Sequence, residues 1–330
     1  MNRVANKTPI LLSIIIVNFE TPDYTLECIR SLYKNSPHCA FEVIVIDNGS
    51  KDDSLGRLRR EAPQVLCIET GANLGFSQAN NLGINNARGN FVLLLNSDTK
   101  ILDNILDKML EYLMASPEVG AMGPRQLYGN GKLQLSWGSF PTLISEAFRK
   151  VLHYRLSLND LKIRDYLEEK FAGSTDVDWV SGSCFMARKE ALTDAGLLDG
   201  RFFMYFEDID LCRRIKDVGW RIHYNSDITL IHYGGVSAKR NMLRVLVEYR
   251  RSQIYFTKKY YGFAGVATLK WLLFLKYTFY LVHSGAAYLR DLVFASEAKE
   301  SFAKLLLSKK TIELVFSRYP QDVAKSLEKA

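Results

Sequence analysis

The sequence predicts an α/β fold, a doubly wound and mostly parallel sheet followed by a basic, apolar helical extension. Over residues 1–125, short β-branched runs alternate with amphipathic helical segments. Positive charge is concentrated near the end of the chain, because residues 239–330 hold 17 Lys and Arg against 7 Asp and Glu, a net charge of +10. The remainder carries −3. We therefore expect a catalytic or binding domain over 1–240 and an extension over 241–330.

Four strands and four helices are predicted in the first half of the chain. Continuous apolar runs predict strands at 11–19, 41–50, 65–70 and 90–101. Helical spacing predicts helices over 21–35, 52–62, 73–89 and 102–116. The first run is only as long as a buried strand and no small-residue cleavage site follows it, so we interpret it as a strand and not a signal peptide.

The second half is less regular. Residues 127–142 are typical of a hairpin or loop, and 144–171 form an amphipathic, charge-rich helical stretch suited to a lid or an insertion near an acceptor. A strand and a helix are predicted within 177–192, a helix over 207–219, and one or two strands within 220–235. The five cysteines show no C-x-x-C spacing, which indicates reduced thiols and a cytoplasmic protein.

Two polar clusters directly follow predicted strands. Asp47 opens "DNGS", and Asp98 closes "NSD" behind Asn96. In doubly wound sheets, ligands bind beyond the carboxyl ends of the strands. Asp98 suits a divalent cation that also bridges a diphosphate, and Asp47 suits a pyrimidine ring N–H. Each cluster alone is also a good turn sequence, but two at one sheet edge favour a ligand site.

The stretch "FFMYFEDIDLCRR", residues 202–214, places three acids beside four aromatic side chains. Glu207 and Asp208 fall at a predicted helix start, where the helix dipole favours negative charge. A partly desolvated carboxylate there suits a general base. The structural alternative is simple N-capping by Asp208, with Asp210 paired to Arg213 or Arg214.

His232 lies at a predicted strand end before Gly-Gly. A neutral imidazole at that place suits a metal site completed with Asp98. The alternative is a histidine that is only packed.

Seven ordered segments resemble glycosyltransferase family 2, in its rhamnosyltransferase-like branch, over residues 11–240. They read "SIIIVNF", "VIVIDNGSKDDS", "NLGFSQANNLGI", "FVLLLNSDT", "WVSGSCFMARKEAL", "GLLDGRFFMYFEDIDLCRRIKDVGWRIHY" and "IHYGGVS". The resemblance implies a GT-A fold, a nucleotide-sugar donor, a divalent metal (Mg²⁺ or Mn²⁺) and inversion at the anomeric carbon.

The resemblance also implies roles for individual residues. Asp208 would be the catalytic base with Glu207 as a supporting acid, and Asp98 and His232 would bind the metal. Nucleotide and donor contacts would come from Val17, Asn18, Glu20, Asp47, Asn73, Gly75, Asn80, Asn96 and Ser97. Asn96 stands where the D-x-D motif has its first acid, which removes one charge from the metal site. The branch often reads L-N-x-D, so we expect an active enzyme.

The expected function is transfer of a sugar, with L-rhamnose from dTDP-rhamnose preferred through the family branch alone. The expected acceptor is a hydroxyl of a glycan or polyprenyl-diphosphate-linked glycan in bacterial cell-envelope synthesis. The stretch 263–283 is apolar and aromatic but interrupted by Lys270 and Lys276. It suits a helix lying on the inner face of the plasma membrane. The alternatives are a helical pair packed on the domain or a homo-oligomer contact.

Three other classes of protein can be compared with the sequence. A sugar-phosphate nucleotidyltransferase would show a glycine-rich, basic loop after the first strand, and "NFETPDYT" at 18–25 has neither Gly nor Lys. A nucleic-acid binder would explain the basic extension but not the acids at three element ends, so no nucleic-acid partner is expected. A catalytically weak or dead nucleotide-sugar-binding protein is the alternative that Asn96 raises.

Overall fold

The computed structural model describes residues 9–235, 242–293 and 298–316. Its contacts divide the chain into two compact units. The first comprises Met1–Phe203 and Glu207–Ser237, and the second comprises Met204–Phe206 and Ala238–Ala330. The predicted boundary at residue 240 lies outside the described residues. The three residues 204–206 group with the C-terminal unit although both of their flanks belong to the first.

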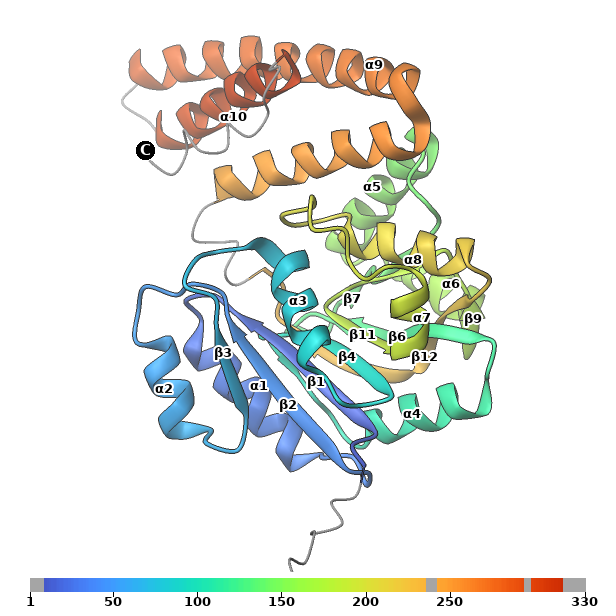
Figure 1. The fold of residues 1–330 in the computed structure, drawn as a ribbon. Helices are drawn as coiled ribbons and strands as arrows, with labels where there is room; N and C mark the ends of the chain where they lie inside the picture. The colour runs from blue at the N-terminus through green and yellow to red at the C-terminus, as the bar shows by residue number, and fades with distance from the viewer. Residues whose placement is uncertain (1–8, 236–241, 294–297, 317–330) are drawn as a thin grey trace, which may run out of the picture. The chain divides into compact units, whose positions relative to one another are not determined.

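A ten-stranded mixed sheet forms the centre of the first unit, with the order β3-β2-β1-β4-β11-β6-β12-β5 (Figure 1). Its main strands are β1 (Leu12–Asn18), β2 (Phe41–Asp47), β3 (Leu66–Glu69), β4 (Phe91–Asn96), β6 (Val119–Leu127), β11 (Cys184–Arg188) and β12 (Arg221–His232). The first four pair in parallel, as do β6 and β12. Strand β11 lies antiparallel between β4 and β6, so the sheet is mixed.

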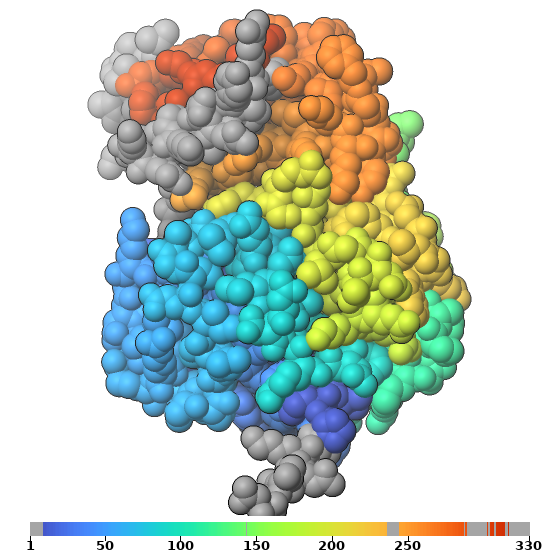
Figure 2. Space-filling model, in the orientation of Figure 1, coloured from blue at the N-terminus to red at the C-terminus, as the bar shows by residue number. Residues whose placement is uncertain are grey.

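Helices cover both faces of this sheet. Helices α1 (Pro22–Lys34), α2 (Ser54–Glu61) and α4 (Ile105–Ala115) contribute to the apolar core on one face, with Ile14, Val43 and Leu93 from the strands. Helix α3 (Gly75–Asn86) packs on β1 and β2, where Gly83 lies against Ile15. Because side chains alternate along a strand, Ile14 and Ile15 face opposite layers. Figure 2 shows the blue-to-cyan first half of the unit in continuous contact with its yellow-green second half.

Between residues 90 and 235, several segments that the sequence predicts as one element are two elements in the structure. The predicted strand 90–101 is two strands, β4 and the short β5 (Thr99–Lys100), because residues 97–98 turn between them. Residues 119–134 form a hairpin of β6 with β7 (Leu133–Gln134). The helical stretch is α5 (Leu143–Ser157) and α6 (Leu161–Lys170). Asp160 caps α6 by accepting the Ile163 N–H at 3.3 Å.

The remaining elements of the first unit are short strands and two helices around β11 and β12. Strand β8 (Trp137–Gly138) pairs with β10 (Trp179–Val180), and β9 (Ser174–Asp176) pairs with β12. Helix α7 (Lys189–Asp194) follows β11, and α8 (Glu207–Asp217) buries Ile209, Cys212 and Ile215 as its spacing predicts. Residues 220–235 form the single strand β12, with an irregular register between Asn225 and Thr229.

The C-terminal unit is helical, with α9 (Met242–Val293) and α10 (Ala298–Phe316). Gly262 interrupts α9 with φ 63° and ψ −159°. Beyond it, Leu269, Leu273 and Tyr277 pack with Ile254 and Ile312. The opposite side exposes Phe263, Trp271, Leu275, Phe279 and Val282. In the described part of the chain, one helix, Arg244–Ala286, is long and apolar enough to cross a membrane by length and composition alone.

The close approach of α3 to β1 generates a first prediction. A Cβ on Gly83 would lie 2.4 Å from Cγ2 of the fully buried Ile15. We expect Gly83→Ala to lower the free energy of unfolding by about 1–3 kcal/mol, because a packed core resists an added methyl group. Urea denaturation followed by circular dichroism measures it.

The matched control is Gly56→Ala in α2, where the added Cβ meets only the ends of the Asp53 and Arg60 side chains. It should be neutral, or stabilising by up to about 1 kcal/mol through helix propensity. Equal effects of the two variants would contradict the packing argument.

Candidate active site

The first part of the site is built by adjacent ends of β1 and β2. Asn18 and Asp47 are register partners, and Asn18 Nδ2 donates to Asp47 Oδ1 at 2.8 Å. Ser50 Oγ donates to the same oxygen at 2.6 Å, and its N–H donates to Oδ2 at 3.2 Å. Asn18 is fully buried and its Oδ1 accepts the Thr25 hydroxyl at 2.7 Å. Asn18 therefore fixes the Asp47 carboxylate.

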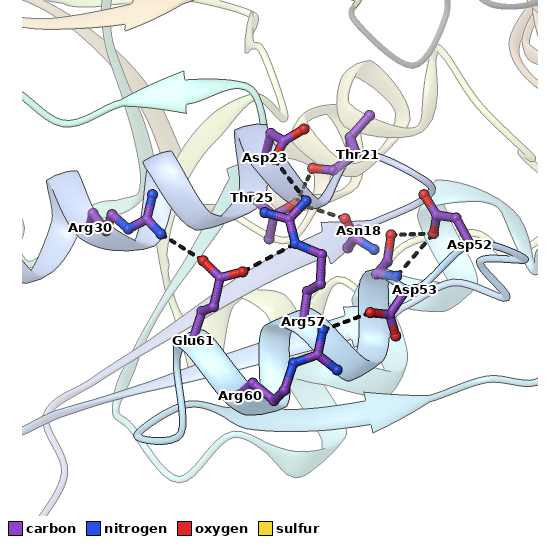
Figure 3. A network of polar contacts seen from close by, with 11 residues as sticks. Asn18, Thr21, Asp23, Thr25, Arg30, Asp52, Asp53, Arg57, Arg60 and Glu61 are labelled. Atoms are coloured by element: carbon purple, nitrogen blue, oxygen red, sulfur yellow. Dashed lines mark hydrogen bonds and ion pairs between the residues drawn. The ribbon is translucent and has the colours of Figure 1, made fainter.

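Figure 3 places Asn18 and Thr25 beside a network of charged side chains on the outer helices. Arg57 of α2 donates to Asp23 of α1 at 2.8 Å and to Glu61 at 3.1 Å. Arg30 donates to Glu61 at 2.8 Å. These exposed pairs tie α1 to α2 behind the β1 end, although each surface pair contributes little stability on its own, about 0–1 kcal/mol.

Asn48 joins the Asp47 loop to the start of α3. Its Oδ1 accepts the Leu74 N–H at 2.9 Å, and its Nδ2 donates to Asn73 Oδ1 at 3.2 Å. Asn73 Oδ1 also accepts the Gly75 N–H at 3.0 Å. Gly75 has φ 81°, and a Cβ there would lie 2.6 Å from the Phe203 carbonyl oxygen. Only glycine fits this close, left-handed position, so Asn73 and Gly75 form a fixed corner of the site.

Asp98 and His232 are brought together by strand pairing. Thr99 of β5 lies opposite His232 of β12, and the Tyr233 N–H donates to the Asp98 carbonyl at 2.9 Å. The Asp98 Oδ1 and His232 Nε2 atoms are 3.2 Å apart. Asn96 Nδ2 is 3.3 Å from the same Nε2. The predicted Asp98–His232 pair therefore exists, with Asn96 beside it.

Gln134 of β7 sets the orientation of His232, and no pattern in the sequence singles Gln134 out. Gln134 Oε1 lies 2.9 Å from His232 Nδ1. If the amide oxygen accepts from a protonated Nδ1, the lone pair of Nε2 points toward Asp98 and Asn96, a tautomer inferred from the hydrogen-bond network.

The donor atoms at this place suit a divalent cation. A carboxylate oxygen and an imidazole nitrogen are ligand types that Mg²⁺ or Mn²⁺ accepts. The Asn96 amide turns its Nδ2, a hydrogen-bond donor and not a ligand, toward His232 Nε2. In the described residues no group of three or more His, Cys, Asp and Glu side chains meets at one point. A cation held by Asp98 and His232 would therefore need further oxygen ligands from substrate or water, as hard cations commonly have.

The turn at residues 181–183 links this pair to Asp208. The Asn96 N–H donates to the Ser183 carbonyl at 2.9 Å. One residue earlier, the Gly182 N–H donates to Asp208 Oδ2 at 3.0 Å. Oδ1 of Asp208 accepts the Ile209 N–H of α8 at 2.8 Å. The carboxylate is thus held by two backbone donors, and Asp208 as a whole residue is half-buried.

The three acids of residues 207–210 have three different environments. Asp210 is fully buried and paired with Arg214 Nε at 2.8 Å, the structural pairing that the sequence left open. Glu207 is buried, and its Oε2 has no hydrogen-bond partner among the described residues. Burial, and then repulsion from Asp208, raise the pKa of Glu207 well above its usual range. Burial also raises the pKa of Asp208, against the opposing effect of its two N–H donors.

Other predicted donor-binding residues lie around these groups. Glu20 has φ 53° and its N–H donates to Ser50 Oγ at 3.0 Å. Ser97 lies 3.5 Å from the Thr21 hydroxyl, and Val17 is partly exposed on β1. Asn80 is buried inside α3, where its Nδ2 donates to the Phe76 carbonyl at 2.9 Å. Asn80 therefore supports α3 from within.

Comparison with known proteins agrees with the fold and the site. A solved mannosyltransferase from Pyrobaculum calidifontis aligns with 98% of this chain and 74% of its own, at TM-score 0.51 and 17% identity. GalNAc-T7 aligns with 75% of this chain and 48% of its own, at TM-score 0.52 and 14% identity. These likenesses and the mixed sheet place the protein in the class of GT-A folds.

The family follows from the sequence comparisons. The model of glycosyl transferase family 2 matches residues 13–196, and the chain belongs to that family. An N-acetylglucosaminyl-diphospho-decaprenol L-rhamnosyltransferase of Mycobacterium tuberculosis is 28% identical over 242 residues, covering 70% of this chain and 79% of its own. Rhamnosyltransferase WbbL of Escherichia coli is 27% identical over 237 residues, covering 68% and 83%.

The environment of Glu207 generates a second prediction. Because folding raises its pKa, the folded carboxyl holds its proton more tightly than the unfolded one. Its contribution to stability is complete below the unfolded pKa and is lost as pH rises through the folded pKa. Glu207→Gln should therefore raise Tm over the wild type more at pH 8 than at pH 5, by roughly 2–4 °C, the shift that about 1 kcal/mol produces.

Thermal unfolding at both pH values measures this, and Glu169→Gln on the exposed face of α6 is the control. If the Glu207 and Glu169 variants show the same pH dependence, Glu207 is not held as the structure indicates.

Proposed function

We propose that this family 2 glycosyltransferase inverts the anomeric carbon of a nucleotide-sugar donor and uses Asp208 as its general base. One observation carries the proposal. The Asp208 carboxylate accepts hydrogen bonds from the Gly182 and Ile209 N–H groups, and residues 182–183 join it to the backbone of Asn96, beside the Asp98–His232 pair. Inverting sugar transfer needs a general base for the acceptor hydroxyl and groups that stabilise the leaving diphosphate, and we assign these roles to Asp208 and to the Asp98–His232 pair.

The chemistry of the proposed step balances without a further reactant. Asp208 accepts the proton of an acceptor hydroxyl while the hydroxyl oxygen forms a bond to the anomeric carbon. The bond from that carbon to the diphosphate oxygen breaks, and its electron pair leaves with the nucleoside diphosphate. Attack from the face opposite the leaving group inverts the carbon. Burial raises the pKa of Asp208 toward the operating pH, which favours proton transfer.

The remaining residues bind and orient the donor. Asp47, fixed by Asn18 and Ser50, is proposed to accept a hydrogen bond from the ring N–H of the nucleotide's pyrimidine. The Asn73–Gly75 corner is proposed to line the nucleotide. Asp98 and His232 would hold Mg²⁺ or Mn²⁺, which neutralises charge on the leaving diphosphate when bound. The Pyrobaculum mannosyltransferase was solved with GDP-Man and Mn²⁺. Asn96 leaves this place with one negative charge less than an acid would supply.

Donor and acceptor are proposed from the relatives. The Mycobacterium protein is named for L-rhamnose and for an N-acetylglucosaminyl-diphospho-decaprenol acceptor, and the Escherichia protein for rhamnose. We extend this to dTDP-rhamnose and a polyprenyl-diphosphate-linked glycan in cell-envelope synthesis, at the cytoplasmic face of the plasma membrane.

A third prediction tests the base. Asp208→Asn should lower kcat by about 10²–10⁴-fold, because a general base contributes that much, while donor binding stays intact. Asp98→Ala should instead weaken metal-dependent donor binding. Release of nucleoside diphosphate from dTDP-rhamnose, UDP-glucose, UDP-galactose, UDP-N-acetylglucosamine and GDP-mannose, with Mg²⁺, Mn²⁺ or EDTA, measures both effects and identifies the donor.

Wild-type turnover by Asp208→Asn would refute the base assignment. No release from any donor, and no thermal stabilisation by any nucleotide, would refute the enzyme itself and favour a non-catalytic protein in which Asn96 has weakened the metal site.

Membrane contact is the second part of the proposal. In the C-terminal unit, Leu269, Leu273 and Tyr277 pack inward while Trp271, Leu275 and Phe279 stay exposed on the same helix. In the first unit, α5 exposes an apolar stripe at helical spacing, namely Ile144, Phe148 and Val151, and its C-cap residue Leu158 is also exposed. The net charge of +10 over 239–330 suits anionic headgroups. Because one side of the α9 segment packs on protein, we favour a surface-bound helix.

A fourth prediction follows. Phe279→Ser in α9 and Phe148→Ser in α5 should each weaken binding to vesicles of phosphatidylcholine with phosphatidylglycerol by about tenfold, the scale of one lost apolar anchor. Co-sedimentation measures it. Met114→Ser in α4, which removes an isolated exposed side chain, is the control. Unchanged binding by both variants, or no binding by the wild type, would contradict membrane contact.

A further inference from the structure

The segment before the proposed base has an unusual backbone. Tyr205 and Phe206 both have φ 68°, in the left-handed region that bulky residues rarely adopt. They immediately precede Glu207 and Asp208, the first residues of α8. Consecutive residues in this conformation persist only where surrounding contacts impose it, and such strain gathers at functional sites.

The contacts that impose it come from the first half of α9, within the C-terminal unit. Ser252 Oγ donates to the Met204 carbonyl at 2.7 Å. The Tyr249 ring lies 5.5 Å from the ring of Tyr205 and 5.3 Å from that of Phe206. Phe256 stacks at a tilt on Phe206 with ring centroids 5.4 Å apart, and both are almost completely buried.

These three residues of α9 form one face of the helix. Tyr249, Ser252 and Phe256 are spaced by three and four residues, so their side chains project from the same side. Together they contact every residue of 204–206. Glu207, the next residue, belongs to the first unit. On the other flank, the Phe203 carbonyl accepts the Phe76 N–H of α3 at 2.7 Å. The short segment is therefore anchored at both ends.

We propose that Tyr249, Ser252 and Phe256 are positioning residues, which hold residues 204–206 left-handed and thereby aim Asp208 at the acceptor hydroxyl. The peptide bond between Phe206 and Glu207 transmits the constraint. If the segment relaxes to the right-handed conformation, the first turn of α8 rotates and Asp208 leaves its Gly182 donor. This inference rests on the proposed role of Asp208.

The test uses the chain with both of its units and five variants. Ser252→Ala and Tyr249→Ala should each lower kcat by about tenfold to a hundredfold, because a misplacement near 1 Å costs that much. The donor KM and the Kd of nucleoside diphosphate should stay within about twofold, since the donor residues belong to the first unit. Tyr249→Phe keeps the ring and should restore kcat.

The matched control is Thr257→Ala, which removes only an intrahelical bond from its hydroxyl to the Gln253 carbonyl at 2.8 Å. It should leave kcat unchanged. The pH profile gives a second readout. Loss of the Gly182 N–H should move the acid limb of kcat to higher pH in the Ser252 and Tyr249 variants, because that donor favours the carboxylate.

Four results separate the possibilities. Lower Tm with unchanged kcat and unchanged acid limb in the Ser252 and Tyr249 variants would overturn the inference and leave a merely structural contact. A parallel loss of kcat and donor affinity would also overturn it. Asp208→Asn is assayed alongside: full turnover there refutes the base assignment itself, whereas an inactive Asp208→Asn beside fully active Ser252 and Tyr249 variants refutes only the positioning role.

Discussion

The hydrogen bond from the Asn96 N–H to the Ser183 carbonyl is the interaction on which the site depends. It exists because β11 enters the sheet antiparallel beside β4, so that the turn before β11 meets the carboxyl end of β4. On the Asn96 side lie Asp98 and His232, and on the Ser183 side Gly182 holds Asp208. A parallel strand at this place would have brought a different end of β11 to Asn96, and the two halves of the site would not meet.

The second constraint is the burial of charge at the start of α8. Three acids within four residues are tolerated because each is handled differently: Asp210 by an ion pair, Asp208 by two N–H donors, and Glu207 by a raised pKa that favours its neutral form. An unpaired buried carboxyl costs stability, and a chain retains such groups mainly where chemistry needs them. The left-handed residues just before them add strain to the same short stretch. Stability and proposed activity therefore oppose one another here.

The C-terminal unit takes part in this balance. Its helix α9 supplies aromatic contacts to Tyr205 and Phe206, and beyond Gly262 it presents an apolar, partly exposed surface. One helix thus combines a proposed positioning face with a proposed membrane face.

The sequence by itself determined the elements and much of the proposed site. Apolar runs and helical spacing located β1 to β4 and α1 to α4, because burial on both faces of a sheet requires β-branched strands. The ends of those strands pointed to Asp47 and Asp98, and the family resemblance pointed to Asp208. Those signals are local, so a reader of the sequence can find them. The resemblance to family 2 was confirmed, as was the GT-A fold.

Only the tertiary structure decided how these residues are held. Gln134 faces His232, Gly182 holds Asp208, and Asn48 fixes the Asn73–Gly75 corner through contacts between segments far apart in the chain. The predicted strand 90–101 divides at residues 97–98, which lets Thr99 pair with β12 beside His232. The role of α9 beside residues 204–206 also has no sequence signal. The local sequence pattern indicates which face of a helix or strand is buried. Only the pairing of segments far apart in the chain decides which side chains meet on that face.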